Sequence, residues 1–324
     1  MGARSSHTPS RHTKADTVER TVHRFSKVHQ GGVNCISPAP SRHTIITGGA
    51  DGNATIFNFN SGKVISYMRH GDRPITAVQS AGAIDAVVTG CRDTKVRLWQ
   101  GSTATVFSGH SLVVTAVAIT PDSDRILSGS RDNCINAWDV RTAKLLYSIS
   151  ESRNLITALK LIPNEHVLVQ TSEDKRVRLW DTRNLQLIHV YPTKHYIQTS
   201  CDVSADGNYI VSGSNGFSGS GCEISLWDVR AQRLVCELRG HTQGVNTVKF
   251  LHDSSVVVSG SQDSLVKIWD VTRRECVLEK RLPGMGAVTD LVTYPDSSIV
   301  CATSGGCVLL TQTDPGCVTE TICF

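Results

Sequence analysis

The chain has 324 residues, of which 40% are apolar and 19% are charged, and this composition excludes wholesale disorder. No apolar run approaches the ~18 residues of a membrane-spanning helix, and no apolar stretch near the N-terminus indicates a secretory signal. The 11 cysteines include no Cys-x-x-Cys pair, which argues against a zinc site and a disulfide framework and favours a reducing compartment. We therefore expect a cytoplasmic protein with no metal and no cofactor.

The N-terminal segment is basic. Residues 1–27 contain six basic and two acidic residues, so they account for the whole net charge of +4. We expect residues 1–20 to be a disordered tail. Its first six residues fit the N-myristoylation pattern, with Gly2 as the acceptor and Ser6 as the hydroxyl residue, although an unmodified tail is the alternative. An acyl chain and basic residues act together on anionic lipid, so the tail is a candidate membrane tether.

The rest of the chain is electrically balanced, with 27 basic and 27 acidic residues. Nucleic-acid-binding domains normally carry a basic patch on the folded body. The sequence therefore does not favour a nucleic-acid partner.

The five tryptophans mark a repeat. Each ends a similar β-rich segment, such as Val96-Arg97-Leu98-Trp99, and they are 39, 42, 47 and 42 residues apart. Steps of 42 residues reach Phe57 before the first tryptophan and Thr311 after the last. A period of ~40–45 residues is that of a four-stranded propeller blade. The predicted units are 29–69, 70–109, 110–150, 151–192, 193–240, 241–282 and 283–324.

Each unit contains four short β-rich runs separated by turn-forming residues. In the third unit these runs are Val114–Thr120, Arg125–Ser130, Cys134–Val140 and Lys144–Ser150. No segment has a sustained 3.6-residue apolar period, so few helices are expected. We predict an all-β, seven-bladed propeller over residues 21–324. Its last sheet needs a fourth strand, from either Thr17–Phe25 or Cys317–Phe324.

Polar residues recur at fixed distances before the aromatic residue that ends each third run. A histidine lies 28 residues before Trp138 and Trp269, a hydroxyl residue lies ten before them and an aspartate six before them. In these features the chain resembles the WD-repeat (WD40) family. The resemblance implies buried His–Ser/Thr–Trp–Asp hydrogen-bond chains, expected to be formed by His70, Thr89, Asp93, Trp99, His110, Ser128, Asp132, Trp138, His241, Ser259, Asp263 and Trp269.

A histidine, a serine and an aspartate in one unit also suggest a hydrolase triad. Their recurrence from unit to unit favours a structural motif, so we expect no catalytic residue. Unit four lacks the histidine and has Gln170 at the hydroxyl position, while unit seven lacks the aspartate and the tryptophan. We expect less rigid packing in both. The resemblance also favours the N-terminal segment as the strand that closes the ring.

Unit five contains an insertion, Asn215–Cys222, which accounts for the 47-residue spacing and replaces the aspartate turn. In a propeller this connection opens on the same face as the histidine-bearing loops. Phe217 lies among glycines and serines, and an exposed aromatic side chain is a plausible interface anchor. The alternative is that Phe217 folds back onto its own blade. We therefore predict Phe217 and Asn215 as partner-binding residues.

Arginine follows the Trp-Asp pair by two residues in units three, four and five, at Arg141, Arg183 and Arg230. This box resembles the one in substrate receptors of cullin-4 ubiquitin ligases, in which the arginine contacts the ligase adaptor. An arginine at this position can also simply pair with a neighbouring acid. Adaptor binding through these three arginines is therefore the alternative function.

Residues 168–183 and 197–230 resemble ciliary members of the WD-repeat family. This resemblance implies a non-catalytic scaffold of ciliated cells that is linked to regulators of Arf-like small GTPases and to ciliary trafficking factors. The sequence contains no nucleophile motif and no phosphate-binding glycine motif. We therefore expect protein partners and no small-molecule substrate.

Overall fold

The computed structural model describes residues 28–323, except residues 42, 252–253, 283 and 315–316. The side chains of residue 83 and of residues 309–323 are also outside the description. The predicted tail, its acceptor Gly2 and the candidate closing strand 17–25 lie outside the described residues.

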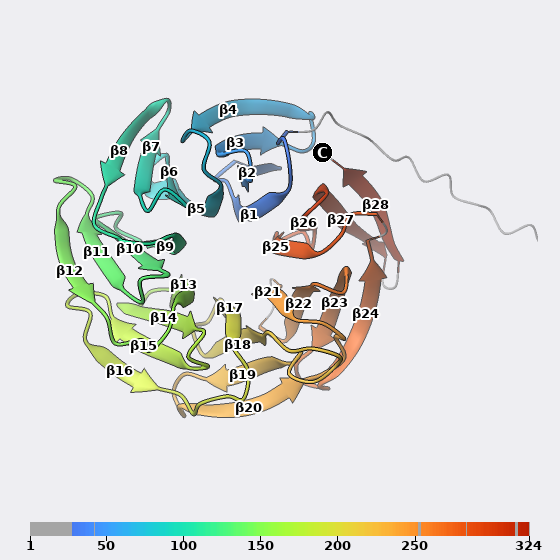
Figure 1. The fold of residues 1–324 in the computed structure, drawn as a ribbon. Helices are drawn as coiled ribbons and strands as arrows, with labels where there is room; N and C mark the ends of the chain where they lie inside the picture. The colour runs from blue at the N-terminus through green and yellow to red at the C-terminus, as the bar shows by residue number, and fades with distance from the viewer. Residues whose placement is uncertain (1–27, 42, 252–253, 283, 315–316, 324) are drawn as a thin grey trace, which may run out of the picture.

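Seven four-stranded antiparallel sheets are arranged radially around a central axis (Figure 1). Each sheet consists of four consecutive strands, so each is one blade. The predicted seven-bladed β-propeller is confirmed, and the five tryptophans lie on the third strands of blades two to six. The described residues contain one helical element, the short 3-10 turn η1 (Gly82–Ile84), and no helix long and apolar enough to cross a bilayer.

The strands of the first three blades follow the chain from the innermost to the outermost position. Blade one consists of β1 (Val33–Pro38), β2 (Thr44–Gly49), β3 (Asn53–Asn58) and β4 (Lys63–Arg69). Blade two consists of β5 (Ile75–Ala81), β6 (Ala86–Cys91), β7 (Val96–Gln100) and β8 (Thr103–Phe107). Blade three consists of β9 (Val114–Ile119), β10 (Arg125–Ser130), β11 (Ile135–Asp139) and β12 (Leu145–Ile149).

The other four blades repeat this order. Blade four consists of β13 (Ile156–Leu161), β14 (Val167–Ser172), β15 (Val177–Asp181) and β16 (Leu187–Val190). Blade five consists of β17 (Gln198–Val203), β18 (Tyr209–Ser214), β19 (Ile224–Asp228) and β20 (Arg233–Leu238). Blade six consists of β21 (Val245–Phe250), β22 (Val256–Ser261), β23 (Leu265–Asp270) and β24 (Glu275–Arg281). Blade seven consists of β25 (Val288–Thr293), β26 (Ile299–Thr303), β27 (Gly306–Asp314) and β28 (Cys317–Cys323).

The hydrophobic core lies between the blades. One cluster joins Val88 of blade two to Ile126 and Trp138 of blade three, and the Trp138 ring meets Phe107 edge-on at 5.9 Å. The second strand of blade three is buried from Ile126 onward, whereas the outermost strand β12 is mostly exposed. Because neighbouring blades cover both faces of the second strands, these strands are buried almost throughout.

The C-terminal strand completes the last blade. β28 pairs with β27 in the order β25-β26-β27-β28, so Cys317–Cys323 provides the fourth strand. The closure by an N-terminal strand that the family resemblance favoured is not the arrangement found. Consecutive strands of one hairpin need only a short turn to pair, whereas strands from opposite chain ends must first close a long loop.

A ring of seven side chains joins the blades around the central channel. The second residue of each innermost strand donates a hydrogen bond, 2.5–2.9 Å long, to the carbonyl oxygen of the first residue of the next innermost strand. Thr289 donates to the Val33 carbonyl and so joins the last blade to the first. The donors are Asn34, Thr76, Thr115, Thr157, Thr199, Asn246 and Thr289.

Two kinds of loop define two faces. The connections between second and third strands, and between blades, open on one side, which we call the histidine face because His29, His70, His110 and His241 lie there. The connections between first and second strands and between third and fourth strands open on the other side. We call it the arginine face, because Arg141, Arg183 and Arg230 lie there.

Candidate functional site

Blade three contains a complete buried hydrogen-bond chain. Trp138 Nε1 donates to Ser128 Oγ at 2.8 Å, and Ser128 Oγ lies 2.8 Å from His110 Nε2. His110 Nδ1 lies 2.9 Å from Asp132 Oδ2. Because a carboxylate only accepts hydrogen bonds, the imidazole proton is on Nδ1 and the serine hydroxyl donates to Nε2. Every polar side-chain group of this hydrogen-bond chain is therefore paired.

Blades one and six repeat this geometry. In blade six the distances are 2.8 Å from Trp269 to Ser259, 2.8 Å from Ser259 to His241 and 2.9 Å from His241 to Asp263. Burial alone would raise the pKa of Asp263, but the hydrogen bonds from His241 and from backbone N–H groups lower that pKa to about 2. In blade one, His29 contacts Asp51 and Thr47, and Thr55 takes the place of the indole donor.

The hydrogen-bond chain predicted for blade two is wrong in one contact. Thr89 Oγ1 lies 2.8 Å from His70 Nε2 and accepts from Trp99 at 2.9 Å, as expected. However, the guanidinium of Arg97 donates to His70 Nδ1 at 2.8 Å and to Asp93 at 2.6 Å, so the aspartate binds arginine instead of histidine. Burial and the Arg97 charge lower the pKa of His70 to about 3. Arg97, two residues before Trp99, thus takes the place of a direct hydrogen bond between His70 and Asp93.

This part of blade two also gathers three potential metal ligands. Donor atoms of His70, Cys91 and Asp93 lie within 4.8 Å of one another. The Arg97 guanidinium already donates to His70 and Asp93. A metal ion would have to displace this cation, so the donor set is suited to the arginine that it holds.

Blade four completes its chain without histidine. Trp180 Nε1 donates to Gln170 Oε1 at 2.7 Å, and the Gln170 amide donates to Ser152, which occupies the place of the histidine. Arg178 donates to Asp174 through both terminal nitrogens, at 3.1 and 2.5 Å. The amide and the guanidinium therefore pair the polar positions that histidine pairs in blades three and six.

In blade five the hydrogen-bond chain runs to a residue that the repeat pattern does not indicate. Trp227 Nε1 donates to Ser212 Oγ at 2.9 Å, and Ser212 donates to Gln198 Oε1 at 2.6 Å. The Gln198 amide in turn donates to Ser214 Oγ and to the Tyr196 carbonyl. The insertion moves Ser212 five positions further from the tryptophan, so a search at fixed distances misses it. Lys194 occupies the place of the histidine.

The insertion presents Phe217 to solvent on a short, well-fixed turn. Phe217 N donates to Ser220 O at 2.8 Å and Ser220 N donates to Phe217 O at 3.0 Å. Ser218 and Gly219 between them have φ of 50° and 80°, as in type I′ hairpin turns. The Phe217 side chain is 71% exposed, so it does not fold back onto its blade.

Two contacts fix the insertion to the neighbouring loops. Gly219 N donates to Thr242 O at 2.9 Å, which ties the turn to the loop bearing His241. Gly221 has a φ of 72° and packs so closely on the Tyr196 ring that an added Cβ would lie 2.3 Å from it. Asn215, the other predicted contact residue, is exposed, and its N–H donates to the Ile197 carbonyl. Phe217 is therefore held in place on the histidine face.

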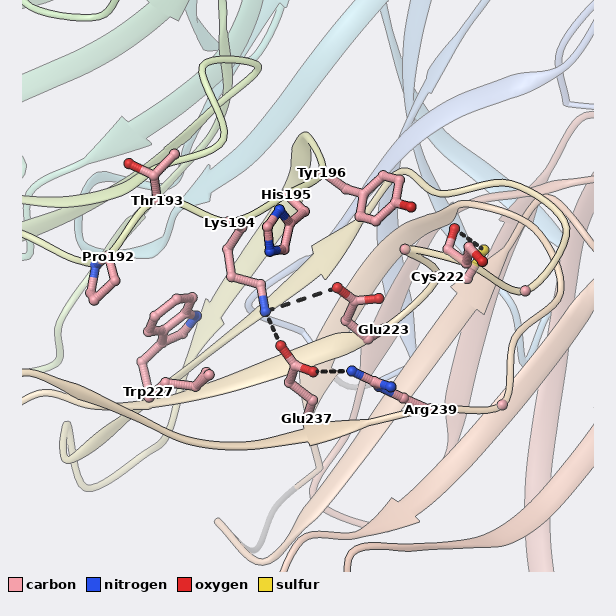
Figure 2. Close-up of a pocket in the computed structure, with 15 residues that line it drawn as sticks. Pro192, Thr193, Lys194, His195, Tyr196, Cys222, Glu223, Trp227, Glu237 and Arg239 are labelled. Atoms are coloured by element: carbon pink, nitrogen blue, oxygen red, sulfur yellow. Dashed lines mark hydrogen bonds and ion pairs between the residues drawn. The ribbon is translucent and has the colours of Figure 1, made fainter.

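A cavity of about 480 Å³ lies beside this turn, lined by the insertion and by the loops on both sides of blade five. Figure 2 shows Lys194 pointing between Glu223 and Glu237, with Trp227 nearby. Lys194 Nζ is hydrogen-bonded to Glu237, lies 3.9 Å from Glu223 and lies 5.9 Å from the centre of the Trp227 ring. The hydrogen bond from Lys194 lowers the pKa of Glu237. The sequence does not indicate this pocket, because its charged residues belong to three separate segments.

The three arginines of the Trp-Asp-x-Arg boxes differ in their contacts. Arg183 forms an ion pair with Asp181 of its own box, with its Nε 3.0 Å from Asp181 Oδ1. The hydrogen bond from Arg183 lowers the pKa of Asp181 to about 2. Arg141 and Arg230 are exposed. All three lie on the arginine face of consecutive blades, away from the insertion.

Four segments match the family model of the WD domain, G-beta repeat: residues 20–58, 101–139, 143–181 and 232–270. These segments are WD40 repeats. They contain the third strands of blades one, three, four and six, including the three blades with a complete His–Asp chain. The WD40 match does not extend over the third strand of blade five. That blade contains the insertion, and its hydrogen-bond chain runs through Gln198 instead of a histidine.

Several curated proteins are similar to this chain. Pre-mRNA-processing factor 19 homolog 2 of Arabidopsis thaliana is 25% identical over 268 residues, which are 80% of this chain and 42% of that protein. The periodic tryptophan protein 2 homolog of Schizosaccharomyces pombe is 34% identical over 33% of this chain and 12% of its own length. Cilia- and flagella-associated protein 52 of Mus musculus is 29% identical over 30% of this chain and 17% of its own length. The chain therefore spans less than half of these relatives.

Proposed function

We propose that this chain is a non-catalytic protein-interaction scaffold that binds a partner on the histidine face of blade five. The observation that carries the proposal is Phe217, a 71% exposed aromatic side chain on a hydrogen-bonded turn. An anchor that is ordered before binding loses little conformational entropy in a complex. Aromatic anchors of this kind dominate the energy of many protein interfaces.

The triad-like residues support a structural role. The Ser128 and Ser259 hydroxyls are fully buried, and each already accepts from a tryptophan and bonds a histidine. A nucleophile must reach a substrate, which these hydroxyls cannot do without opening the blade. The same geometry in separate blades is what a repeated structural element requires.

We further propose that the scaffold acts in ciliary trafficking, together with regulators of Arf-like small GTPases. Residues 168–183 and 197–230 resemble WD repeat-containing protein 31, and this resemblance supports the proposal. The name of one relative, cilia- and flagella-associated protein 52, is in keeping with it. Residues 197–230 include the insertion, so the distinctive sequence and the candidate binding surface coincide.

Affinity purification of the wild-type chain and of Phe217→Ser from ciliated cells tests the scaffold proposal. We expect the wild type to retain a set of proteins that Phe217→Ser loses, with GTPase regulators among them. Tyr67→Ser is the matched control, since Tyr67 is an exposed aromatic residue on the distant strand β4. Equal retention by all three proteins would contradict a binding role for Phe217.

A tether to anionic membrane through the N-terminal tail is the second part of the proposal. Gly2→Ala removes the acceptor of the acyl chain and is expected to release the protein into the soluble fraction. Neutralising Arg4, Arg11 and Lys14 is expected to leave acylation intact but to weaken binding to anionic vesicles, most clearly at low salt. Mass spectrometry of the mature N-terminus is the direct measurement. A free or acetylated Gly2 in cells that contain the transferase would leave a soluble scaffold.

The alternative function is that of a substrate receptor for a cullin-4 ubiquitin ligase. Arg141, Arg183 and Arg230 lie on one face of three consecutive blades, which favours this alternative, whereas the pairing of Arg183 with Asp181 favours a local role. Retention of the cullin and its adaptor by the wild type, and their loss on Arg141→Ala with Arg230→Ala, would support the receptor.

A further inference from the structure

The pocket beside Phe217 is lined by two basic side chains, Lys194 and Arg239, and by two acidic ones, Glu223 and Glu237. Its enclosed charged groups are the ammonium of Lys194 and the carboxylates of Glu223 and Glu237. Arg239 also pairs with Glu237, at 2.7 Å, and its side chain is 76% exposed. Glu223 is only 11% exposed, and the nearest cation, Lys194, is 3.9 Å away, beyond hydrogen-bonding distance. Glu223 is therefore a nearly buried carboxylate whose ion pair with Lys194 is longer than a hydrogen bond.

Blade six shows the balanced form of the same arrangement. Lys267 Nζ lies 5.9 Å from the centre of the Trp269 ring and 2.5 Å from Glu279, so one ammonium meets one carboxylate. Glu279 is 52% exposed and is well solvated. Blade five has the same lysine-over-indole contact but adds a second, enclosed carboxylate, Glu223. The ion pair of Glu223 with Lys194 is too long for a hydrogen bond, so a ligand that donates hydrogen bonds to this carboxylate can stabilise it further.

The pocket already accommodates a cation of the chain itself. Lys194 shows that an ammonium group fits between the carboxylates and beside the indole of Trp227. A guanidinium suits the remaining space better than a second ammonium. It is planar, donates two parallel hydrogen bonds to one carboxylate and stacks on aromatic rings, and Tyr196, which is 37% exposed, lines the pocket.

We propose that this pocket receives an arginine side chain of the partner whose apolar surface covers Phe217. The guanidinium pairs with Glu223, and the pocket, at about 480 Å³, lies within the size range of ligand sites. Ser220 belongs both to the pocket lining and to the turn that holds Phe217, so the aromatic anchor and the arginine site are adjacent. This inference rests on the proposed function, since it names the chemistry of the partner at the same surface.

The probe for the test is N-acetyl-arginine amide, with N-acetyl-citrulline amide as the neutral isostere, and binding is followed by ligand-observed NMR on the full chain. We expect saturable binding of the arginine amide and at least tenfold weaker binding of the citrulline amide. Glu223→Gln is expected to weaken arginine binding by tenfold or more. Lys194→Met removes the internal competitor and is expected to strengthen it.

Glu279→Gln in blade six is the matched control and is expected to change nothing. Equal binding of the two amides, or unchanged arginine binding in both pocket variants, would overturn the proposal. If Glu223→Gln does not fold, the opposite effect expected for Lys194→Met still decides. Phe217→Ser is expected to bind the arginine amide like the wild type while losing the protein partner. Failure of the arginine site is therefore distinguishable from failure of the proposed scaffold function.

Discussion

Blades three and five have a tryptophan at the same position, but the hydrogen-bond chains that start from the two indoles differ. In blade three, Trp138 starts a hydrogen-bond chain that passes through a serine and a histidine to Asp132, and all four residues bond within the same blade. In blade five, Trp227 bonds only Ser212, and Gln198 completes the chain from the start of strand β17. The place of the histidine is then taken by Lys194, which faces a cavity.

The comparison shows how a repeat can give up one of its structural groups without losing the fold. The polar atoms of the tryptophan and the serine must be paired because they are buried, but the acceptor need not be an imidazole. Once Gln198 supplies that acceptor, the histidine and aspartate positions of blade five are free for other groups. The insertion, Phe217 and the charged pocket all occupy that region.

The largest expected effect is the loss of stability caused by Asp132→Ala in blade three. The carboxylate accepts hydrogen bonds from His110 Nδ1 and from the backbone N–H groups of Ser111 and Cys134. Each buried donor left without an acceptor costs about 1–3 kcal/mol. Urea unfolding of the variant and the wild type measures the difference. A free energy of unfolding within about 0.5 kcal/mol of the wild type would refute the structural role of this aspartate.

Gln198→Ala tests whether the substitute in blade five is equivalent to the histidine of blade three. The variant leaves the Ser212 hydroxyl without its acceptor, so we expect a loss of about 1–3 kcal/mol in the free energy of unfolding. Gln262→Ala, at an exposed glutamine of blade six, is the matched control and is expected to cost less than about 0.5 kcal/mol. If both glutamine variants are equally stable, blade five does not depend on the rerouted chain.

A smaller effect is expected in acid for the complete chain of blade six. The pKa of Asp263 is lowered to about 2, against ~3.9 in an unfolded chain. A carboxylate with a depressed pKa stabilises the fold above its unfolded pKa, and this stabilisation is lost as the pH falls through the folded value. Between pH ~4 and ~2 the wild type should therefore lose on the order of 1–2 kcal/mol more than Asp263→Asn. Unfolding free energies measured against pH for both proteins provide the comparison, and parallel curves would contradict it.

The smallest expected effect on stability is that of Phe217→Ser. The side chain is mostly exposed, so its loss should change the free energy of unfolding by less than about 0.5 kcal/mol. The same variant is expected to lose the protein partner. A thermal melt measured beside a binding assay separates the two properties, and a large drop in melting temperature would mean that Phe217 supports its own blade.

Much of the fold could be predicted from the sequence, because the repeat is a local property of the chain. The spacing of the tryptophans indicates the number of blades, and the apolar runs of unit three predict β9 to β12 to within a residue or two. Of the candidate site, the exposed insertion was predictable from its composition. The pocket was not, since Lys194 and Glu237 are 43 residues apart and meet only where the loop before blade five lies beside strand β20.

The sequence by itself determined the periodic features of this protein: seven units, four strands in each, and an indole at the end of the third strand of five units. These follow from patterns within about 40 residues, where turn residues and alternation of apolar residues act locally. Tertiary structure decided which side chains meet. Arg97 lies between His70 and Asp93, and the C-terminal strand closes the ring. The physical reason is that a buried polar group accepts any partner of suitable geometry, and folding alone determines which candidate is within reach.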